Sequence, residues 1–373
     1  MAALKILMIG AGGIGGYYAA RLAGAGHQVV LTARGSHLQA LKADGLTVDY
    51  EGRVLWHGLP ACDHQTLLRD YHPNDFDLVA IALKSTATGA VMSELCDWLR
   101  SGSVPVLSLQ NGVDNEPLIA EVVGEARVLG GLAVRIGGHI TEPGKVFAEG
   151  VAQIVMGAWP AQQPKDDPRA DFLKVLEVAF NEAGIPTTMT ENIRYELWRK
   201  LVINNGINPL SALTRLDTRS LTHHPQFRHV VFGMMSETVE ASKADGVNLT
   251  RKDLEEMFEL ISSFNAIKTS MLIDREKGRP LELESIAGAV LMVSDKLPPI
   301  WSLHGLGTDP EHRISDPAHC PVALQRKACT RLAGPPACGS VPPGGSGFKH
   351  SLGLAADQYL PLPADAEYLG GPD

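Results

Sequence analysis

Lys200, Asn204 and Asn208 recur at every fourth position of residues 197–210, a segment expected to form a helix with a wide apolar surface. In a helix this spacing places the lysine ammonium and the two amides along one side. Buried polar groups are costly unless a partner satisfies them, and a small polar substrate would do so. The alternative is a solvated helix face. Pro209 should end or kink the helix, in which case Asn208 is only a helix-end residue.

A glycine-rich turn near the amino terminus predicts a dinucleotide site. An apolar strand at residues 6–9 leads into Gly10-Ala11-Gly12-Gly13-Ile14-Gly15, and a helical segment from residue 17 to 22 follows. Gly10, Gly12 and Gly15 fit the GxGxxG spacing in the strand–turn–helix context that this fingerprint requires. The turn lets a pyrophosphate approach the backbone and the amino-terminal amides of the helix.

The residue after the second strand bears on the choice of cofactor. Residues 28–32 predict that strand, and Arg34 follows it where an NAD site would carry an acid. Arg34 can pair with a 2′-phosphate, so the sequence favours NADPH over NADH. An exposed arginine after a strand is the alternative interpretation.

Polar residues also follow two further predicted strands, residues 78–83 and 104–109. Lys84 follows the first and Asn111 the second, and ligands of open α/β sheets gather at the carboxyl ends of strands. Farther along, Ser270 and Glu282 flank a charged segment, residues 274–279. We interpret that segment mainly as a solvated face and keep Ser270 and Glu282 as candidate site residues.

Composition narrows the function classes. The formal charge of −9 without a basic cluster argues against nucleic acid as a partner. Apolar segments are too short to span a membrane. Five cysteines without CxxC pairs indicate neither a disulfide scaffold nor a metal site, so we expect a cytoplasmic protein. A homodimer is one option for its assembly.

The 373 residues allow two domains. Residues 1–190 alternate strand and helix patterns, including strands at 128–133 and 153–156, which predicts an open α/β sheet. Residues 191–297 show helical periodicity, with a helix at 230–243 and a capping signal at Thr250 and Asp253. Residues 298–373 hold about half of the prolines, and we expect them to be disordered. Metal binding by Cys320, Cys329 and Cys338 in this tail is not expected.

Taken together, these motifs resemble the ketopantoate reductase (2-dehydropantoate 2-reductase) family across roughly residues 4–296. The resemblance rests on the order and spacing of the motifs: Gly10 to Gly15, Leu83-Lys84, Gln110-Asn111-Gly112, Lys200 to Leu210, and Ser270 to Glu282. The chain departs from the family after Pro298-Pro299, where family members usually continue with a further long helix.

The resemblance implies an α/β Rossmann-type dinucleotide-binding domain, an all-α second domain and a cleft between them. It implies that Lys200 donates the proton and that Asn204, Asn208 and Ser270 surround the substrate. Asn111 would touch cofactor and substrate, with Lys84 and Glu282 at the nicotinamide–ribose end. The leading interpretation is NADPH-dependent reduction of ketopantoate. A relative that reduces another 2-oxo acid and a catalytically silent NADPH-binding protein remain alternatives.

Overall fold

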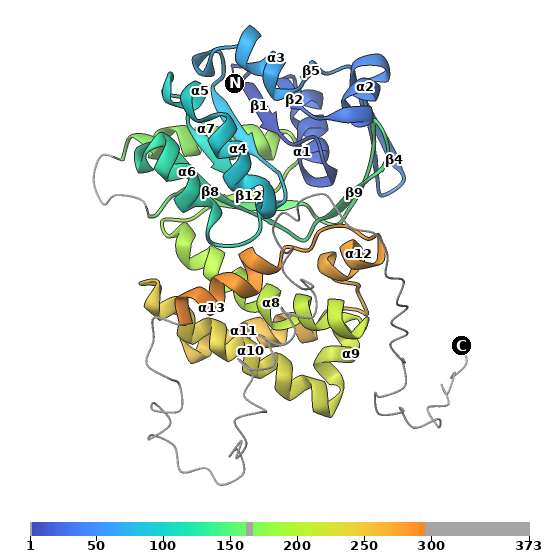
Figure 1. Cartoon of the computed structure of the whole chain (residues 1–373), viewed down its shortest axis with the longest axis vertical. Coiled ribbons are helices and arrows are strands. Elements are labelled where there is room, and N and C mark those ends of the chain that lie inside the picture. The colour runs from blue at the N-terminus through green and yellow to red at the C-terminus, as the bar shows by residue number, and fades with distance from the viewer. Residues whose placement is uncertain (1, 162–166, 295–373) are drawn as a thin grey trace, which may run out of the picture. The chain divides into compact units, whose positions relative to one another are not determined.

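The apolar segments of the first domain form one eight-stranded sheet, in the order β12-β11-β8-β7-β6-β1-β2-β5 (Figure 1). The computed structural model describes residues 2–161 and 167–294, which all belong to one compact unit. The strands are β1 Lys5–Ile9, β2 Gln28–Thr32, β5 Ala61–Cys62, β6 Leu78–Ile81, β7 Val106–Ser108, β8 Val128–Val134, β11 Gln153–Ala158 and β12 Thr187–Met189.

The strands from β8 to β5 are parallel, whereas β11 runs antiparallel to β8 and β12 runs parallel to β11. Chain order reverses at β1, which lies between β2 and β6. Such a switch point is where open α/β sheets bind their ligands. The Rossmann-type fold predicted from the sequence is therefore confirmed, with two strands of opposite direction, β11 and β12, added at one edge.

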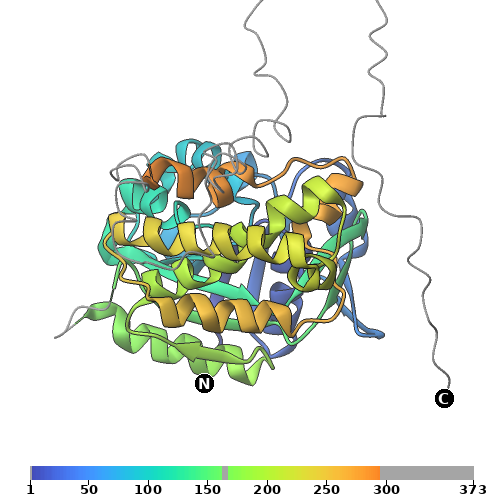
Figure 2. The same cartoon turned by 90° about the horizontal axis from the view of Figure 1, so that it is seen from below.

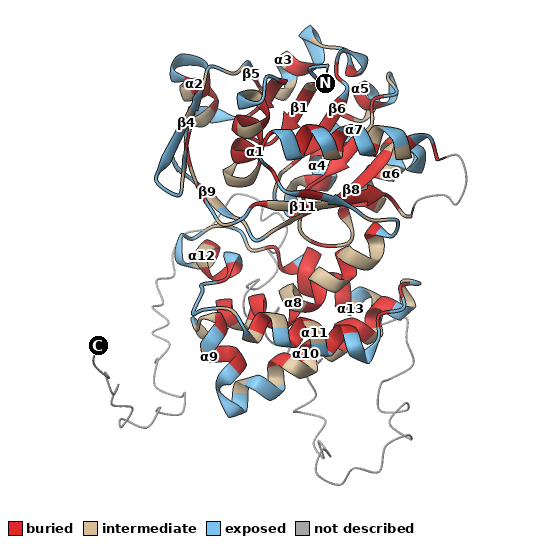
Figure 3. Ribbon diagram, turned by 180° about the vertical axis from the view of Figure 1, so that it is seen from behind, coloured by how far each residue is buried: buried red, intermediate tan, exposed pale blue. Residues whose placement is uncertain are grey.

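Helices cover both faces of this sheet, because successive residues of each strand point to opposite faces. Ile6 and Met8 of β1 share a core with Tyr17, whereas Leu7 and Ile9 belong to the core on the opposite face, with Trp98. Figure 3 shows β1, β6 and β8 mostly buried. The helices and 3-10 turns are α1 Gly13–Gly24, α2 Gly35–Asp44, α3 His64–Asp70, η1 Pro73–Asp75, η2 Ser85–Ala87, α4 Thr88–Glu94, α5 Cys96–Arg100, α6 Asn115–Val123, η3 Glu125–Arg127 and α7 Pro168–Glu182.

A second, four-stranded sheet was not predicted. Its order is β4-β3-β10-β9. Its strands are β3 Leu46–Tyr50, β4 Arg53–His57, β9 Gly137–Glu142 and β10 Lys145–Glu149. Buried Val48 and Val146 pack in the core with α1, but Val54 and Trp56 are 69% and 60% exposed. β4 and β9 contain no buried residue and give a weak periodic signal, which explains why the sequence did not reveal these two strands.

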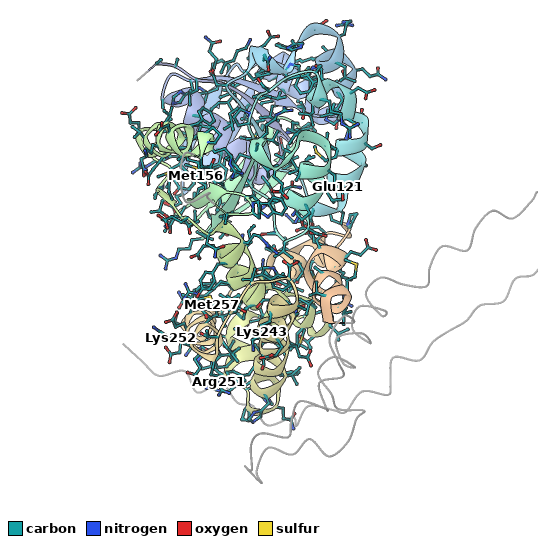
Figure 4. The ribbon with its side chains drawn as sticks, turned by 90° about the vertical axis from the view of Figure 1, so that its left-hand side faces the viewer. Glu121, Met156, Lys243, Arg251, Lys252 and Met257 are labelled. Atoms are coloured by element: carbon teal, nitrogen blue, oxygen red, sulfur yellow. The ribbon has the colours of Figure 1, made fainter. Side chains whose placement is uncertain are left out.

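The second domain is helical, as predicted. Its elements are α8 Ile193–Thr214, α9 Thr218–His223, α10 Pro225–Ala244, α11 Arg251–Ser262, α12 Ser270–Glu276, the π-helix η4 Glu284–Gly288 and α13 Ala289–Ser294. Figure 2 shows its long helices running side by side. In Figure 4, Lys243 and Met257 mark this domain, and Glu121 and Met156 mark the sheet domain. The predicted cap is confirmed, since Thr250 and Asp253 form a reciprocal capping box at the start of α11.

The expectation that the Lys200 helix ends or kinks at Pro209 is wrong as regards the ending. The helix α8 continues to Thr214 with Pro209 inside it. Proline lacks the N–H that would bond to the carbonyl of Asn205, but Ile207 and Ala212 on either side are buried in the same core as Met235. Packing thus overrides the local preference, and Asn208 is a buried residue within the helix.

The predictions for the tail, disorder of residues 298–373 and no metal at Cys320, Cys329 and Cys338, lie outside the described residues. The domain boundary at residue 190 remains a prediction. Within residues 2–161 and 167–294, no helix combines the length and apolar character needed to cross a membrane.

Candidate active site

The glycine-rich turn lies at the carboxyl end of β1, where α1 begins without a side-chain cap. Gly10 has φ of +104°, a conformation that favours glycine, and a Cβ on Gly15 would lie 2.0 Å from the Gly10 carbonyl oxygen. A Cβ built on Gly12 meets no atom within 4 Å, so the space beside the turn is open. The turn therefore fits a pyrophosphate on uncapped helix amides.

Two contacts hold this turn against β2. The Thr32 hydroxyl accepts the Gly10 N–H at 3.1 Å, and the Thr32 carbonyl accepts the Ala11 N–H at 3.0 Å. Arg34 comes two residues later, exposed at the start of α2. It stands at the end of the strand beside the turn, where a cofactor ribose is expected.

Lys84 connects the sheet domain to the helical domain. Its Nζ lies 2.8 Å from Asp274 Oδ2 and 3.1 Å from Glu282 Oε2. The other oxygen of Glu282 accepts the backbone N–H of Ser85 at 2.9 Å and its hydroxyl at 2.8 Å. The sheet domain thus contributes a cation and the helical domain two carboxylates, of which Lys84 and Glu282 were candidate residues in the sequence and Asp274 was not.

The charges in this cluster stabilise one another. Burial alone would raise the pKa of Glu282, but the Lys84 ammonium and the Ser85 hydrogen bonds hold that pKa below its usual value. Burial opposes the charge on Lys84 in the same way, and the two carboxylates raise its pKa. The side chain of Lys84 remains 47% exposed, so a bound ligand can still reach it.

Lys200 of the helical domain contacts Asn111 of the sheet domain, and the family resemblance had assigned both residues to one site. Lys200 Nζ donates to Asn111 Oδ1 at 3.0 Å and to the backbone carbonyl of Ala133 at 2.7 Å. Asn111 follows β7 and Ala133 lies near the end of β8, so adjacent strands supply both acceptors.

Burial lowers the pKa of Lys200 to about 8, an effect that the Glu282 carboxylate partly offsets. Removal from water disfavours the charged form of a lysine. A lysine with a pKa near the operating pH can give a proton to a developing alkoxide and recover it afterwards. This arrangement suits a general acid for carbonyl reduction.

The remaining predicted substrate residues lie on α8 and α12. Asn204 is half-buried and Asn208 is buried, one and two helical turns beyond Lys200. Ser270 is the exposed first residue of α12, which packs against α8. Their roles in substrate binding stay predictions.

Sequence reasoning missed three contributors. Asp274 was assigned to a solvated face but is only 4% exposed and pairs with Lys84. Its burial beside Met271 on α12 is the helical-spacing signal that could have revealed it. Ser85 and the Ala133 carbonyl were also missed, although both lie at strand ends already predicted to gather ligands.

A separate hollow of about 350 Å³ contains none of the predicted site residues. Val113, Trp159 and Trp198 line part of it, and its charged Arg194 and Asp245 pair with each other. We place the candidate site at Lys84 and Lys200 because Lys84 follows β6 and Lys200 contacts residues near the carboxyl ends of β7 and β8, on the side where the open glycine turn follows β1.

Comparison with known families agrees with this assignment. Residues 6–161 match the model described as ketopantoate reductase PanE/ApbA, and residues 192–297 match its C-terminal model. A 2-dehydropantoate 2-reductase from Halobacterium salinarum is 30% identical over 295 residues, which cover 77% of this chain and 91% of that protein. The chain belongs to the ketopantoate reductase family. It is therefore an oxidoreductase with a nicotinamide dinucleotide-binding fold.

Solved structures support the fold. The 2-dehydropantoate 2-reductase of Methylococcus capsulatus is 29% identical, with a TM-score of 0.68 over 79% of this chain and 91% of that one. A D-mandelate dehydrogenase with NADH and anilino(oxo)acetate has a TM-score of 0.72 over 88% of this chain and all of that one. At 20% identity, this second likeness shows the fold alone.

Proposed function

We propose that this ketopantoate reductase family member reduces 2-dehydropantoate to pantoate with NADPH. The observation that carries the proposal is the Lys200 ammonium held between Asn111 and Ala133 at the domain boundary. The names of relatives at about 30% identity support the substrate. We expect the reaction to run in the cytoplasm as a step toward pantothenate and coenzyme A.

The residues that would hold the cofactor are spread over the sheet edge. The turn from Gly10 to Gly15 would receive the pyrophosphate and Arg34 the 2′-phosphate. Lys84, Asn111 and Glu282 would lie toward the nicotinamide end. When bound, the cofactor supplies a hydride to the carbonyl carbon of the substrate.

Lys200 supplies the matching proton. Its ammonium polarises the ketone and protonates the oxygen as negative charge develops there, and general acid catalysis of this kind contributes about 10²–10⁴-fold. Desolvation strengthens the interaction with the developing charge. Asn204, Asn208 and Ser270 would bind the carboxylate and hydroxyl groups of the substrate without adding a competing charge.

The substrate side chain needs a direct test, because the fold also serves a D-mandelate dehydrogenase. Full-length protein is mixed with NADPH and ketopantoate, pyruvate or 2-oxoisovalerate, and absorbance of the reduced cofactor is followed. A clear preference for ketopantoate in kcat/KM supports the proposal. Preference for another 2-oxo acid, or NADPH binding without turnover, would refute it.

A further inference from the structure

Three buried polar side chains connect the ends of two strands that carry the candidate site. Thr88 and Asn115 begin α4 and α6, and Gln110 follows β7. They are 0%, 1% and 2% exposed respectively. The proposed reaction assigns no role to any of them.

Their hydrogen bonds form one continuous path. Gln110 Nε2 donates to the Leu83 carbonyl at 3.2 Å and to Thr88 Oγ1 at 2.7 Å. The Thr88 hydroxyl donates to Asn115 Oδ1 at 2.7 Å. Asn115 Nδ2 then donates to the Asn111 carbonyl at 2.7 Å.

Both ends of this path reach the candidate site. Leu83 immediately precedes Lys84, which pairs with Glu282. Asn111 accepts the hydrogen bond of Lys200. The path therefore fixes the end of β6 relative to the loop after β7, and with it the Lys84–Glu282 pair relative to Lys200.

Thr88 is the central link because its hydroxyl accepts from Gln110 and donates to Asn115. Removing the hydroxyl would leave a buried donor and a buried acceptor without partners, which favours rearrangement of both amides. The backbone carbonyl of Asn111 would then lose the hydrogen bond from Asn115. As a result, the Asn111 side chain would no longer be held toward Lys200.

We propose that Thr88, Gln110 and Asn115 are positioning residues that hold Asn111 against the Lys200 ammonium. The inference rests on the proposed function in one respect, the role of Lys200 as proton donor. If these residues only fill the core, a buried threonine elsewhere in the domain should behave like Thr88.

The test compares Thr88→Val, which removes the hydroxyl at nearly constant volume, with Thr88→Ser, which keeps it. Thr187→Val is the matched control. Thr187 is also buried, and its hydroxyl donates to the Ile185 carbonyl at 2.8 Å on the edge strand β12. Thermal unfolding reports the general cost of each substitution.

The decisive readout is the pH dependence with which a small amine-reactive acylating reagent modifies Lys200. Mass spectrometry measures the extent of this modification. Loss of the Asn111 acceptor disfavours the ammonium, so Thr88→Val should move the labelling midpoint downward by about half a pH unit, roughly threefold more labelling below the midpoint. Thr88→Ser should restore the midpoint, and Thr187→Val should leave it unchanged.

Turnover gives the second readout. Thr88→Val should lower kcat for reduction about tenfold or more, as expected for a misplaced catalytic group, while NADPH affinity is retained. An unmoved or raised labelling midpoint, or an equal shift in Thr187→Val, overturns the proposal. If Thr88→Val does not fold, Asn115→Ala, which removes the direct contact with Asn111, decides by the same criteria.

The two readouts separate the two hypotheses. The labelling experiment needs no substrate, so a shifted midpoint in a protein that does not reduce ketopantoate supports the positioning role and contradicts only the proposed reaction. An active wild-type enzyme with an unshifted midpoint in Thr88→Val supports the reaction and contradicts the positioning role.

Discussion

Lys200 Nζ, on a helix of the second domain, donates a 3.0 Å hydrogen bond to Asn111 Oδ1 at a strand end of the first. The two residues are 89 positions apart in sequence, and neither domain alone contains this pair. The proposed proton donor is thus held by a residue of the cofactor domain. Any substitution or condition that changes this contact should change proton transfer before it changes folding.

The pH dependence of the reaction follows from the lowered pKa of Lys200, about 8. Reduction needs the protonated amine, so kcat/KM for the 2-oxo acid should be constant below pH 8 and fall about tenfold per pH unit above it. Oxidation of the 2-hydroxy acid needs the neutral amine and should rise through the same range. Initial rates in both directions between pH 6 and 10 test this, and parallel profiles would contradict it.

Lys84 should contribute to stability in a pH-dependent manner. Lys84→Ala leaves the buried carboxylates of Asp274 and Glu282 without its ammonium. The free energy of unfolding at pH 7 should fall by about 1–3 kcal/mol, less than for a fully buried pair because Lys84 is 47% exposed. Lys145→Ala, which breaks an exposed pair with Glu142, is the control and should have no measurable effect.

The sign of this pH effect comes from Glu282, whose folded-state pKa is lowered. Its contribution is present above the unfolded-state pKa and disappears as pH falls through the folded-state value. The difference between wild type and Lys84→Ala should therefore shrink below about pH 4. Denaturant unfolding at pH 7 and at lower pH values measures it, and a difference independent of pH would rule out the charge interaction as its cause.

Arg34 should determine the choice of cofactor. A hydrogen bond between charged groups contributes about 1.5–3 kcal/mol, so Arg34→Ala should weaken NADPH binding about 10- to 100-fold. NADH binding, which involves no 2′-phosphate, should hardly change. Fluorescence titration with both cofactors measures this, with the exposed Arg53→Ala on β4 as control. Equal losses for NADPH and NADH would refute the assignment.

Substitutions of two neighbouring asparagines on α8 should have separate effects, one on substrate binding and the other on stability. Asn205 is fully buried and donates to the Thr238 hydroxyl at 2.9 Å, so Asn205→Ala should lower the free energy of unfolding by about 1–3 kcal/mol. Asn204 is half-buried on the Lys200 side, so Asn204→Ala should raise KM for the 2-oxo acid with little loss of stability. Steady-state kinetics and thermal unfolding of both variants test this. The opposite pattern would remove Asn204 from the substrate site.

The predictability of this fold from sequence follows from how each segment is buried. β1 and β2 are apolar, short and bounded by turn residues, and α11 begins with a local capping box, so their signals are complete within a few residues. β4 and β9 bury little apolar surface and exist because they pair with β3 and β10, which local patterns do not encode. At Pro209 the local sequence predicted a helix end that the structure does not have. Packing of the buried residues on both sides of Pro209 keeps the helix continuous there.

The candidate site shows the same division. Lys84, Asn111 and Lys200 could be predicted because each follows a strand or repeats at helical spacing. Asp274 was missed despite its helical spacing with Met271, because the partner that reveals its role, Lys84, lies 190 residues away in the sequence. The Ala133 contact with Lys200 is made by a backbone carbonyl. Every residue has such an acceptor, so the residue type at this position does not predict the contact.

The central claim is that Lys200 donates the proton in a ketone reduction, and the most direct measurement compares wild type and Lys200→Ala in single turnovers. Protein saturated with NADPH is mixed rapidly with ketopantoate, and cofactor oxidation is followed while NADPH affinity is measured separately. The account predicts that the rate falls about 10²–10⁴-fold and that NADPH affinity is retained. Loss of NADPH binding with unchanged turnover per bound enzyme would contradict it.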